Sequence, residues 1–322
     1  MPNTERLTIY DVSLRDGLQR HTPYIPVDQK LKLFYALTDS GIRDLEVTSF
    51  VSPKAIPQLA DAASLYQAIQ QVDQSQNITG QRDALVINER GVQHALSANV
   101  NGLSLVLIAS ETLSQKNSRV GMQAALQRAH NLIQQAIEHR NLSGRMLRIR
   151  AYVAAAWVCP FEGITPIKRS IDMTQQLLEW GVDEVALADT VGHATPSQVG
   201  SLIKHLIAEG INPNQLAVHL HDTLAFGLAN ASAAIEAGVR TIDASIGGLG
   251  GCPFAPGAAG NLATEDIVLL ATRLGFDTGI DLERLHQAVT IAEEVTQRTL
   301  GGRTRAWWQN RSPESVLSRP SL

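Results

Sequence analysis

Two histidines separated by a single residue, His219 and His221, are the sharpest chemical feature of this 322-residue sequence. They lie in an apolar run typical of a buried β-strand, in which residues i and i+2 point to the same face. Two imidazoles on one face, close to a carboxylate, form the donor set of a metal site. A lone histidine is more often a structural side chain satisfied by its neighbours. A pair with acidic residues expected on the same rim favours a metal.

Asp16, Glu46 and Asp189 are the acidic residues that the strand pattern places on that rim. Asp16 with two imidazoles, and with the remaining positions open to substrate oxygens, suits Mg²⁺, Mn²⁺ or another octahedral divalent ion. Zn²⁺ with the same ligands is the less favoured alternative. A cysteine-rich zinc site is excluded because the chain has only two cysteines.

Arg15 and Glu46 each have a plainer interpretation beside the catalytic one. Arg15 and Asp16 precede Gly17 and could form an ordinary polar turn after the first strand. Glu46 stands inside an apolar run, where a carboxylate is costly unless it is paired or bound to a metal. Arg15 could be its partner.

A glycine-rich segment, residues 247–261, follows the last predicted strand and contains Cys252. Glycine allows the backbone to approach a ligand closely. A thiol on this rim could act as a nucleophile or a proton donor. The alternative is a phosphate-binding glycine loop with an incidental cysteine. The other cysteine, Cys159, has no obvious acid–base neighbour and is expected to be structural.

The elements that must position these residues alternate along the chain. Short apolar runs, typical of parallel strands buried on both faces, span residues 8–14, 44–50, 83–87, 103–109, 147–155, 184–189, 216–221 and 241–246. Helical periodicity is found in residues 28–40, 57–71, 88–97, 122–140, 166–180, 196–209 and 225–237.

About eight β/α units predict a (β/α)₈ TIM barrel, whose active sites lie at the C-terminal ends of the strands. An open doubly wound sheet is the alternative, although no G-x-G-x-x-G follows the first strand. A further helix is expected over residues 281–300. We expect one domain, residues 1–300, followed by a polar tail, residues 301–322, with Trp307 and Trp308. A packed or solvated extension is favoured over a functional basic lid.

Composition excludes several classes of protein. Hydrophobic residues make up 44% and charged residues 18%, so a large core can form and disorder is not expected. The net charge of −4 argues against nucleic acid as the main partner. No apolar stretch approaches the length needed to span a bilayer. The few cysteines and a start without a targeting signature predict a cytoplasmic protein without a membrane partner.

Several of these segments resemble one family. Residues 13–19 (S-L-R-D-G-L-Q) are similar to the opening motif of metal-dependent lyases and aldol/Claisen-type barrel enzymes. Residues 45–54 (L-E-V-T-S-F-V-S-P-K), 218–223 (V-H-L-H-D-T), 247–253 (G-G-L-G-G-C-P) and 260–266 (G-N-L-A-T-E-D) resemble the 3-hydroxy-3-methylglutaryl-CoA lyase family. The resemblance runs from about residue 11 to about residue 300.

The resemblance implies a role for each matching position. Asp16, His219 and His221 would bind the divalent metal, with Asn261 as a further ligand. Arg15 would stabilise an enolate oxygen and Cys252 would protonate the product carbanion. Glu46 and Asp189 would be acidic groups in or beside the metal site. The expected contacts to substrate or CoA are Gln19, Ser49, Lys116 and Asn117.

The implied reaction is a retro-Claisen cleavage of an acyl-CoA substrate that yields acetyl-CoA and a keto acid. A homodimer is expected from the family. Alternatives are a lyase for a related thioester, such as citramalyl-CoA or a longer 3-hydroxyacyl-CoA, a condensing synthase or aldolase of the superfamily, and a diverged binding protein. Val12-Ser13-Leu14 and Arg20-His21 depart from the usual V-G-P and N-E of the family, which leaves the acyl group open.

Overall fold

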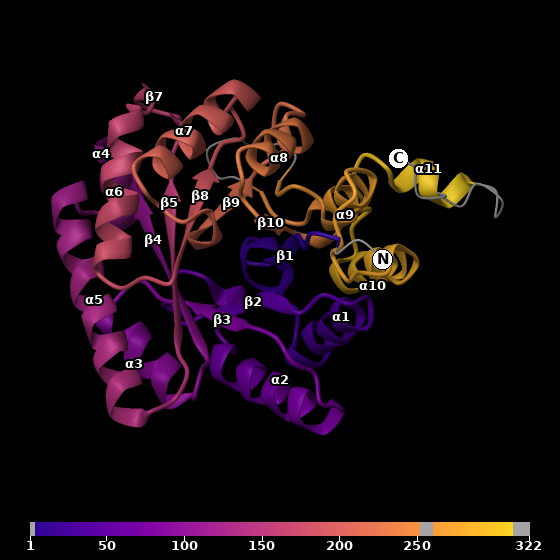
Figure 1. Cartoon of the computed structure of the whole chain (residues 1–322). Helices are drawn as coiled ribbons and strands as arrows, with labels where there is room; N and C mark the ends of the chain where they lie inside the picture. The colour runs from indigo at the N-terminus through magenta and orange to yellow at the C-terminus, as the bar shows by residue number, and fades with distance from the viewer. Residues whose placement is uncertain (1–3, 252–259, 312–322) are drawn as a thin grey trace.

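The computed structural model describes residues 4–251 and 260–311. Within them, eight parallel strands close into a barrel in which β1 pairs with both β2 and β10 (Figure 1). The strands are β1 (Thr8–Asp11), β2 (Asp44–Ser49), β3 (Arg82–Leu85), β4 (Gly102–Ile108), β5 (Arg148–Ala154), β8 (Glu184–Asp189), β9 (Leu216–Leu220) and β10 (Thr241–Ala244). The predicted TIM barrel is confirmed, and the open sheet was the wrong alternative.

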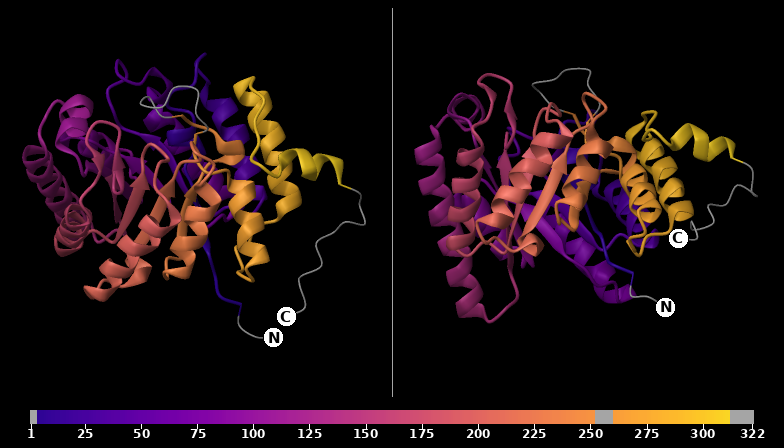
Figure 2. Two further views of the ribbon diagram at one scale, coloured as in Figure 1. Left: turned by 90° about the horizontal axis from the view of Figure 1, so that it is seen from above. Right: turned by 45° about the horizontal axis from the view of Figure 1, so that its top comes forward.

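Helices surround the barrel and bury its outer face (Figure 2). They are α1 (Val27–Asp39), α2 (Ala62–Gln76), α3 (Glu89–Ser97), α4 (Glu111–Ser118), α5 (Met122–Ser143), α6 (Ile167–Glu179), α7 (Pro196–Ala208), α8 (Gly227–Glu236), α9 (Thr264–Arg273), α10 (Leu282–Thr296) and α11 (Arg305–Asn310). The predicted C-terminal helical extension is confirmed: α10 packs against α1 and α9. No helix in the described part of the chain is long and apolar enough to cross a membrane.

Local sequence signals account for many of the element boundaries. Thr195 and Gln198 form a capping box at the start of α7, with Pro196 in the first turn. Gly41 ends the turn after α1 with a φ of +105°, and a β-carbon there would lie 2.4 Å from the carbonyl oxygen of Gly279. Only glycine fits that backbone and that close contact.

Several boundaries differ from the predicted ones. The first strand ends at Asp11 rather than at residue 14, because Ser13–Gly17 forms a π-helical turn. Residues Pro57–Leu59 form a separate 3₁₀ turn before α2. Helices α4 and α9 were not predicted, because α4 is short and polar and α9 directly follows the glycine-rich segment.

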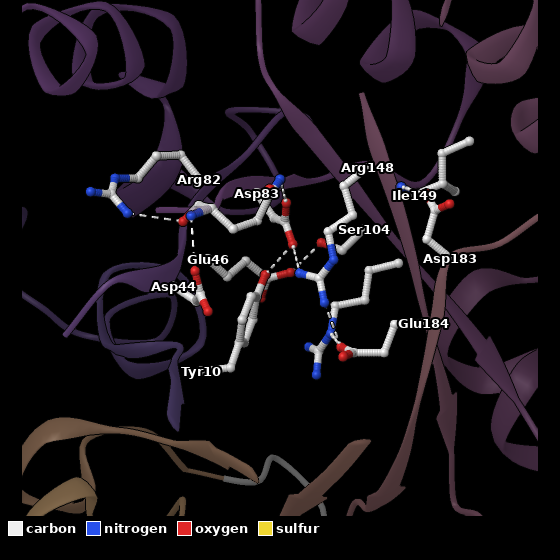
Figure 3. Close-up of polar contacts among 12 residues, drawn as sticks. Tyr10, Asp44, Glu46, Arg82, Asp83, Ser104, Arg148, Ile149, Asp183 and Glu184 are labelled. Carbon is white, nitrogen blue, oxygen red and sulfur yellow. Dashed lines mark hydrogen bonds and ion pairs between the residues drawn. The ribbon is translucent and has the colours of Figure 1, made fainter. Parts of the chain in front are cut away.

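The interior of the barrel contains charged residues as well as apolar ones. Asp83 accepts hydrogen bonds from Tyr10 (2.6 Å) and Arg148 (3.0 Å), and Figure 3 shows both side chains pointing toward it. Glu184 binds both Arg148 (2.7 Å) and Arg150 (2.6 Å). Buried charges are tolerated only when they are paired, so this network depends on each of its partners.

Candidate active site at the C-terminal end of the barrel

Asp16, His219 and His221 lie together at the C-terminal end of the strands. One ligand atom from each residue lies within 4.8 Å of the others. His219 is in β9, His221 directly follows that strand, and Asp16 belongs to the π-helical turn after β1. All three side chains are largely buried. The ends of β1 and β9, which β10 separates in the barrel, therefore contribute to one cluster of oxygen and nitrogen donors.

The π-helical turn positions Asp16 through short-range contacts. The amide of Gly17 donates to the carbonyl of Val12 at 3.0 Å, and Asp11 accepts from the amide of Ser13 at 2.9 Å. A β-carbon at Gly17 would lie 2.8 Å from the hydroxyl of Ser245. Glycine at this position therefore lets the turn pack closely against Ser245, which follows β10.

Asp16 is held as a carboxylate. It accepts hydrogen bonds from Arg15 (2.6 Å), Gln19 (2.5 Å) and Asn261 (2.8 Å). Burial raises its pKa, but the Arg15 guanidinium and the two imidazoles outweigh burial and lower the pKa to about 2. Asp16 is therefore ionised at neutral pH, as a metal ligand must be.

The two imidazoles face each other through their Nε2 atoms, which are 3.3 Å apart. Burial and the neighbouring His219 lower the pKa of His221 to about 4, so His221 is neutral near pH 7. Nδ1 of His221 and Oδ1 of Asn261 are buried and have no hydrogen-bond partner among the described residues. The unsatisfied amide oxygen of Asn261, whose NH₂ group donates to the Asp16 carboxylate, fits a divalent cation.

Arg15 also contacts Glu46, so the ion pair considered from the sequence is present. Glu46 accepts a further hydrogen bond from Ser104 and lies 3.4 Å from the hydroxyl of Tyr152. Burial raises the pKa of Glu46, and the Arg15 guanidinium opposes that rise. Glu46 thereby holds Arg15 beside Asp16.

Asp189 lies apart from the cluster. Its carboxylate accepts hydrogen bonds from the amides of His193 (3.1 Å) and Ala194 (3.0 Å), in the turn after β8. Burial raises its pKa above the usual value. In this structure Asp189 stabilises a loop of the rim.

A cavity of about 440 Å³ opens above the cluster. Arg15, Asp16, Gln19, Asn117 and both histidines line its polar side. Its apolar wall is formed by Val51, Ile56, Leu85, Ile87, Val106, Ile108 and Leu113. The cavity is therefore suited to a ligand with one polar, metal-binding end and an apolar or thioester portion.

The remaining expected substrate contacts are placed differently. The hydroxyl of Ser49 is buried and donates to the carbonyl of Leu85 at 3.1 Å. Lys116 is exposed on α4, with its ammonium 4.9 Å from the centre of the Phe161 ring. Neither side chain lines the cavity. Asn117, the next residue of α4, does.

The cysteines differ in what the structure shows. Cys252 lies outside the described residues, although Gly251, which precedes it, lines the cavity. Cys159 is buried, with its Sγ 2.9 Å from the hydroxyl of Ser110. This environment is that of a packed structural thiol.

Sequence reasoning missed three residues that support the cluster: Ser104, Tyr152 and Asp243. Asp243 lies 3.2 Å from Nδ1 of His219. Burial raises the pKa of Asp243, but the Arg150 guanidinium outweighs burial and lowers it. The sequence did offer a signal for Asp243, because it is a charged residue inside an apolar strand, as Glu46 is.

The fold and the cluster define the class of protein: a (β/α)₈ barrel with a carboxylate–imidazole site at the C-terminal ends of its strands. A family model described as HMGL-like matches residues 6–291. The chain belongs to this HMGL-like family, and the resemblance seen in the motifs is confirmed.

Individual relatives agree along almost the whole chain. Hydroxymethylglutaryl-CoA lyase YngG of Bacillus subtilis is 37% identical over 303 residues, which cover 94% of this chain and 97% of that protein. The cytoplasmic 3-hydroxy-3-methylglutaryl-CoA lyase of Rattus norvegicus is 36% identical, with 92% and 82% covered. A crystal structure of the Bacillus subtilis HMG-CoA lyase matches with a TM-score of 0.86 at 34% identity, covering 96% of this chain and 100% of that one.

A second solved structure was determined with ligands. It is an HMG-CoA lyase from Acinetobacter baumannii in complex with coenzyme A and 3-methylmalate. It matches with a TM-score of 0.85 at 34% identity, covering 99% of this chain and 100% of that one.

Proposed function

We propose that this protein is a divalent-metal-dependent carbon–carbon lyase that cleaves 3-hydroxy-3-methylglutaryl-CoA, or a close analogue, to acetyl-CoA and acetoacetate. The observation that carries the proposal is the cluster of Asp16, His219 and His221 beside Arg15 on one wall of the cavity. The full-length similarity to hydroxymethylglutaryl-CoA lyases supports the same reaction.

Asp16, His219 and His221 would hold the metal, with the buried amide oxygen of Asn261 as a further donor. When bound, a divalent cation lowers the pKa of a substrate hydroxyl and offsets the charge of a substrate carboxylate. Oxygen atoms of Asp16, Asn261 and the substrate would fill most of the positions beside the two imidazoles, and a six-coordinate shell rich in oxygen suits Mg²⁺ or Mn²⁺ better than Zn²⁺.

Arg15 is the residue that faces the developing negative charge. A base takes the C3 hydroxyl proton, and the electron pair left on the oxygen forms the carbonyl of the keto acid. The C2–C3 bond breaks, and its electron pair passes to the acetyl thioester as the enolate. Arg15 lines the cavity and is held by Glu46, so it can stabilise the enolate oxygen without moving. Glu46 thus acts through Arg15, and Asp189 supports the rim.

We assign the final proton transfer to Cys252. The enolate carbon must gain one proton to become the methyl group of acetyl-CoA. Gly251 lines the cavity, so the chain approaches the site one residue before this thiol. Gln19 and Asn117 line the cavity and would contact the substrate directly. Ser49 would hold the backbone of Leu85, which also lines the cavity, and Lys116 would contact CoA from its exposed position on α4.

A homodimer in the cytoplasm is the assembly and location that we propose. The buried free thiol of Cys159 suits a reducing compartment. Light scattering after size-exclusion chromatography would give a mass of two chains. A mass of one chain would contradict the dimer.

The decisive experiment is an assay of the metal-free protein supplemented with Mg²⁺, Mn²⁺ or Zn²⁺. The substrates are 3-hydroxy-3-methylglutaryl-CoA, citramalyl-CoA and a longer 3-hydroxyacyl-CoA, and the products are measured by mass spectrometry. We expect metal-dependent release of acetyl-CoA and acetoacetate from the first substrate. Metal-independent turnover, or condensation without cleavage, would contradict the proposal.

A further inference from the structure

We infer that Asp243 is a positioning residue that fixes the ring of His219 with its proton on Nδ1, so that Nε2 is free to bind the metal. This inference rests on the proposed metal site. It concerns a residue outside the ligand set, and it makes metal affinity depend on a contact inside the barrel.

The placement of Asp243 follows from strand register. In the parallel pair β9–β10, Asp243 is the direct neighbour of His219. Neighbouring residues in register point to the same side of a sheet, here the interior of the barrel. The carboxylate of Asp243 is 1% exposed, and its Oδ2 lies 3.2 Å from Nδ1 of His219.

The contact determines which ring nitrogen carries the proton. Arg150 donates to both oxygens of Asp243, at 2.5 and 3.0 Å, so this carboxylate is ionised and can only accept hydrogen bonds. Nδ1 of His219 must then be the donor. The other nitrogen, Nε2, keeps its lone pair and points toward Nε2 of His221.

Arg150 keeps Asp243 from rotating. Its guanidinium carbon lies 4.0 Å from the centre of the Tyr10 ring and 4.9 Å from the centre of the Tyr152 ring. It also donates to Glu184 at 2.6 Å and to the hydroxyl of Tyr152 at 2.7 Å. A guanidinium with this many partners is fixed in place, so its two parallel hydrogen bonds hold the carboxylate of Asp243 in one orientation.

The same guanidinium connects to the other half of the site. The Tyr152 hydroxyl, which it contacts, lies 3.4 Å from Glu46, and Glu46 binds Arg15. Arg15 in turn binds Asp16 at 2.6 Å. Contacts through the barrel interior thus link His219 to Asp16, so one buried arginine supports a ligand in β9 and a ligand in the turn after β1.

The test is the substitution Asp243→Asn, which keeps the size of the side chain. Its single oxygen can satisfy Arg150 or His219, and its NH₂ group must face one of them. A ring that faces the NH₂ group accepts through Nδ1 and carries its proton on Nε2, which blocks metal binding. Outer carboxylate partners of metal-binding histidines typically change metal affinity by about 10- to 100-fold.

Mn²⁺ affinity, followed by electron paramagnetic resonance of the free ion, is the first measurement. We expect the Kd of Asp243→Asn to rise about 10- to 100-fold. The matched control is Asp83→Asn, another buried carboxylate with arginine and tyrosine partners but without contact to the cluster. Its Kd should stay within about twofold of the wild type.

Nitrogen-15 NMR of histidine-labelled protein, with His219 assigned by a His219→Asn variant, is the second measurement. The wild type should show the proton on Nδ1, and Asp243→Asn should show it on Nε2. This readout does not depend on turnover, and a general loss of stability would not produce it. Should Asp243→Asn fail to fold, Arg150→Lys takes its place in the Mn²⁺ titration, because it removes the two-point hold on Asp243 while keeping the charge. Its Kd should rise, whereas its proton should stay on Nδ1 because Asp243 remains a carboxylate; an unchanged Kd would overturn the positioning role.

Failure of the proposed metal site and failure of the role of Asp243 would give different results. A wild-type protein that binds no Mn²⁺ would overturn the proposed metal site and the inference with it. Stoichiometric Mn²⁺ binding by the wild type, with an unchanged Kd and an unchanged proton position in Asp243→Asn, would overturn the role of Asp243 alone.

Discussion

Arg15 is shared by two carboxylates, and this sharing explains how one side chain can serve both stability and chemistry. Its guanidinium contacts Asp16 and Glu46, which leaves the three side chains with one net negative charge. A bound divalent cation would reverse that sign and attract an anionic substrate. The pairing that makes Glu46 tolerable in the interior therefore also prepares the site for an anion.

His221 provides a direct test of the metal cluster. Replacing His221 with alanine removes one of three donors that lie within 4.8 Å of one another. We expect the metal content after purification, measured by inductively coupled plasma mass spectrometry, to fall at least about tenfold. His205→Ala, at an exposed position of α7, is the control. Equal metal content in both variants would rule out a ligand role for His221.

Cys252 can be tested by comparing the two cysteines of the chain. Cys252→Ala should retain Mn²⁺ binding but lose most cleavage activity, about 10²- to 10⁴-fold, because it removes a general acid. Cys159→Ala, at the packed thiol beside Ser110, should keep most of its activity. Wild-type turnover by Cys252→Ala would refute the proton-donor role.

At the scale of elements, Asp266 of α9 holds the segment before α11 through three hydrogen bonds. Asp266 accepts hydrogen bonds from the amides of Arg303 (2.6 Å) and Thr304 (3.0 Å) and from the Thr304 hydroxyl (2.6 Å). Helix α11 then packs Trp308 on His286, with ring centres 4.2 Å apart. The start of the C-terminal extension is therefore packed on the barrel.

Asp266→Ala should loosen this attachment. It leaves three donors without their acceptor, so we expect the free energy of local opening to fall by about 1–3 kcal/mol. Hydrogen exchange followed by mass spectrometry should show faster exchange in residues 303–310 and unchanged exchange in β4 and β5. Asp172→Ala, which removes an exposed ion pair in α6, is the control. Identical exchange of residues 303–310 in the two variants would contradict the role of Asp266.

At the scale of the whole molecule, Glu265 makes stability depend on pH. Its buried carboxylate accepts from the amides of Gly247 (3.0 Å) and Gly302 (2.6 Å), so it joins the glycine-rich segment to the C-terminal extension. Burial raises its pKa from 4.5 to about 7. Between these values the folded state binds more protons than the unfolded state, so this group lowers stability as the pH rises from about 4.5 to 7 and adds no further change above 7.

Glu265→Gln should remove that dependence. The shift in pKa corresponds to a loss of at most about 3 kcal/mol in the unfolding free energy of the wild type across this range. Urea unfolding of both proteins at several pH values from 5 to 8 measures the difference, in which the other titrating groups cancel. The wild-type curve should fall more steeply than the variant curve. Parallel curves would show that Glu265 does not change its protonation on folding.

Local patterns were enough to predict the barrel, because short apolar runs and helical periodicity are properties of neighbouring residues. Spacing alone also predicted that His219 and His221 share a face, and their Nε2 atoms are 3.3 Å apart. The same patterns missed α4 and α9, which have weak periodicity or follow a glycine-rich run. They also extended β1 through residues that form a π-helical turn.

The sequence by itself determined the fold class, the chemical types at the rim and, through its motifs, the family. Only the tertiary structure decided which of these residues meet. The register of β9 against β10 brings Asp243 next to His219, whereas Asp189 binds backbone amides in the turn after β8. The physical reason is the separation of the interacting residues along the chain. Periodicity is a property of short stretches of sequence, whereas strand register and the partners of buried charges depend on contacts between residues far apart in the chain.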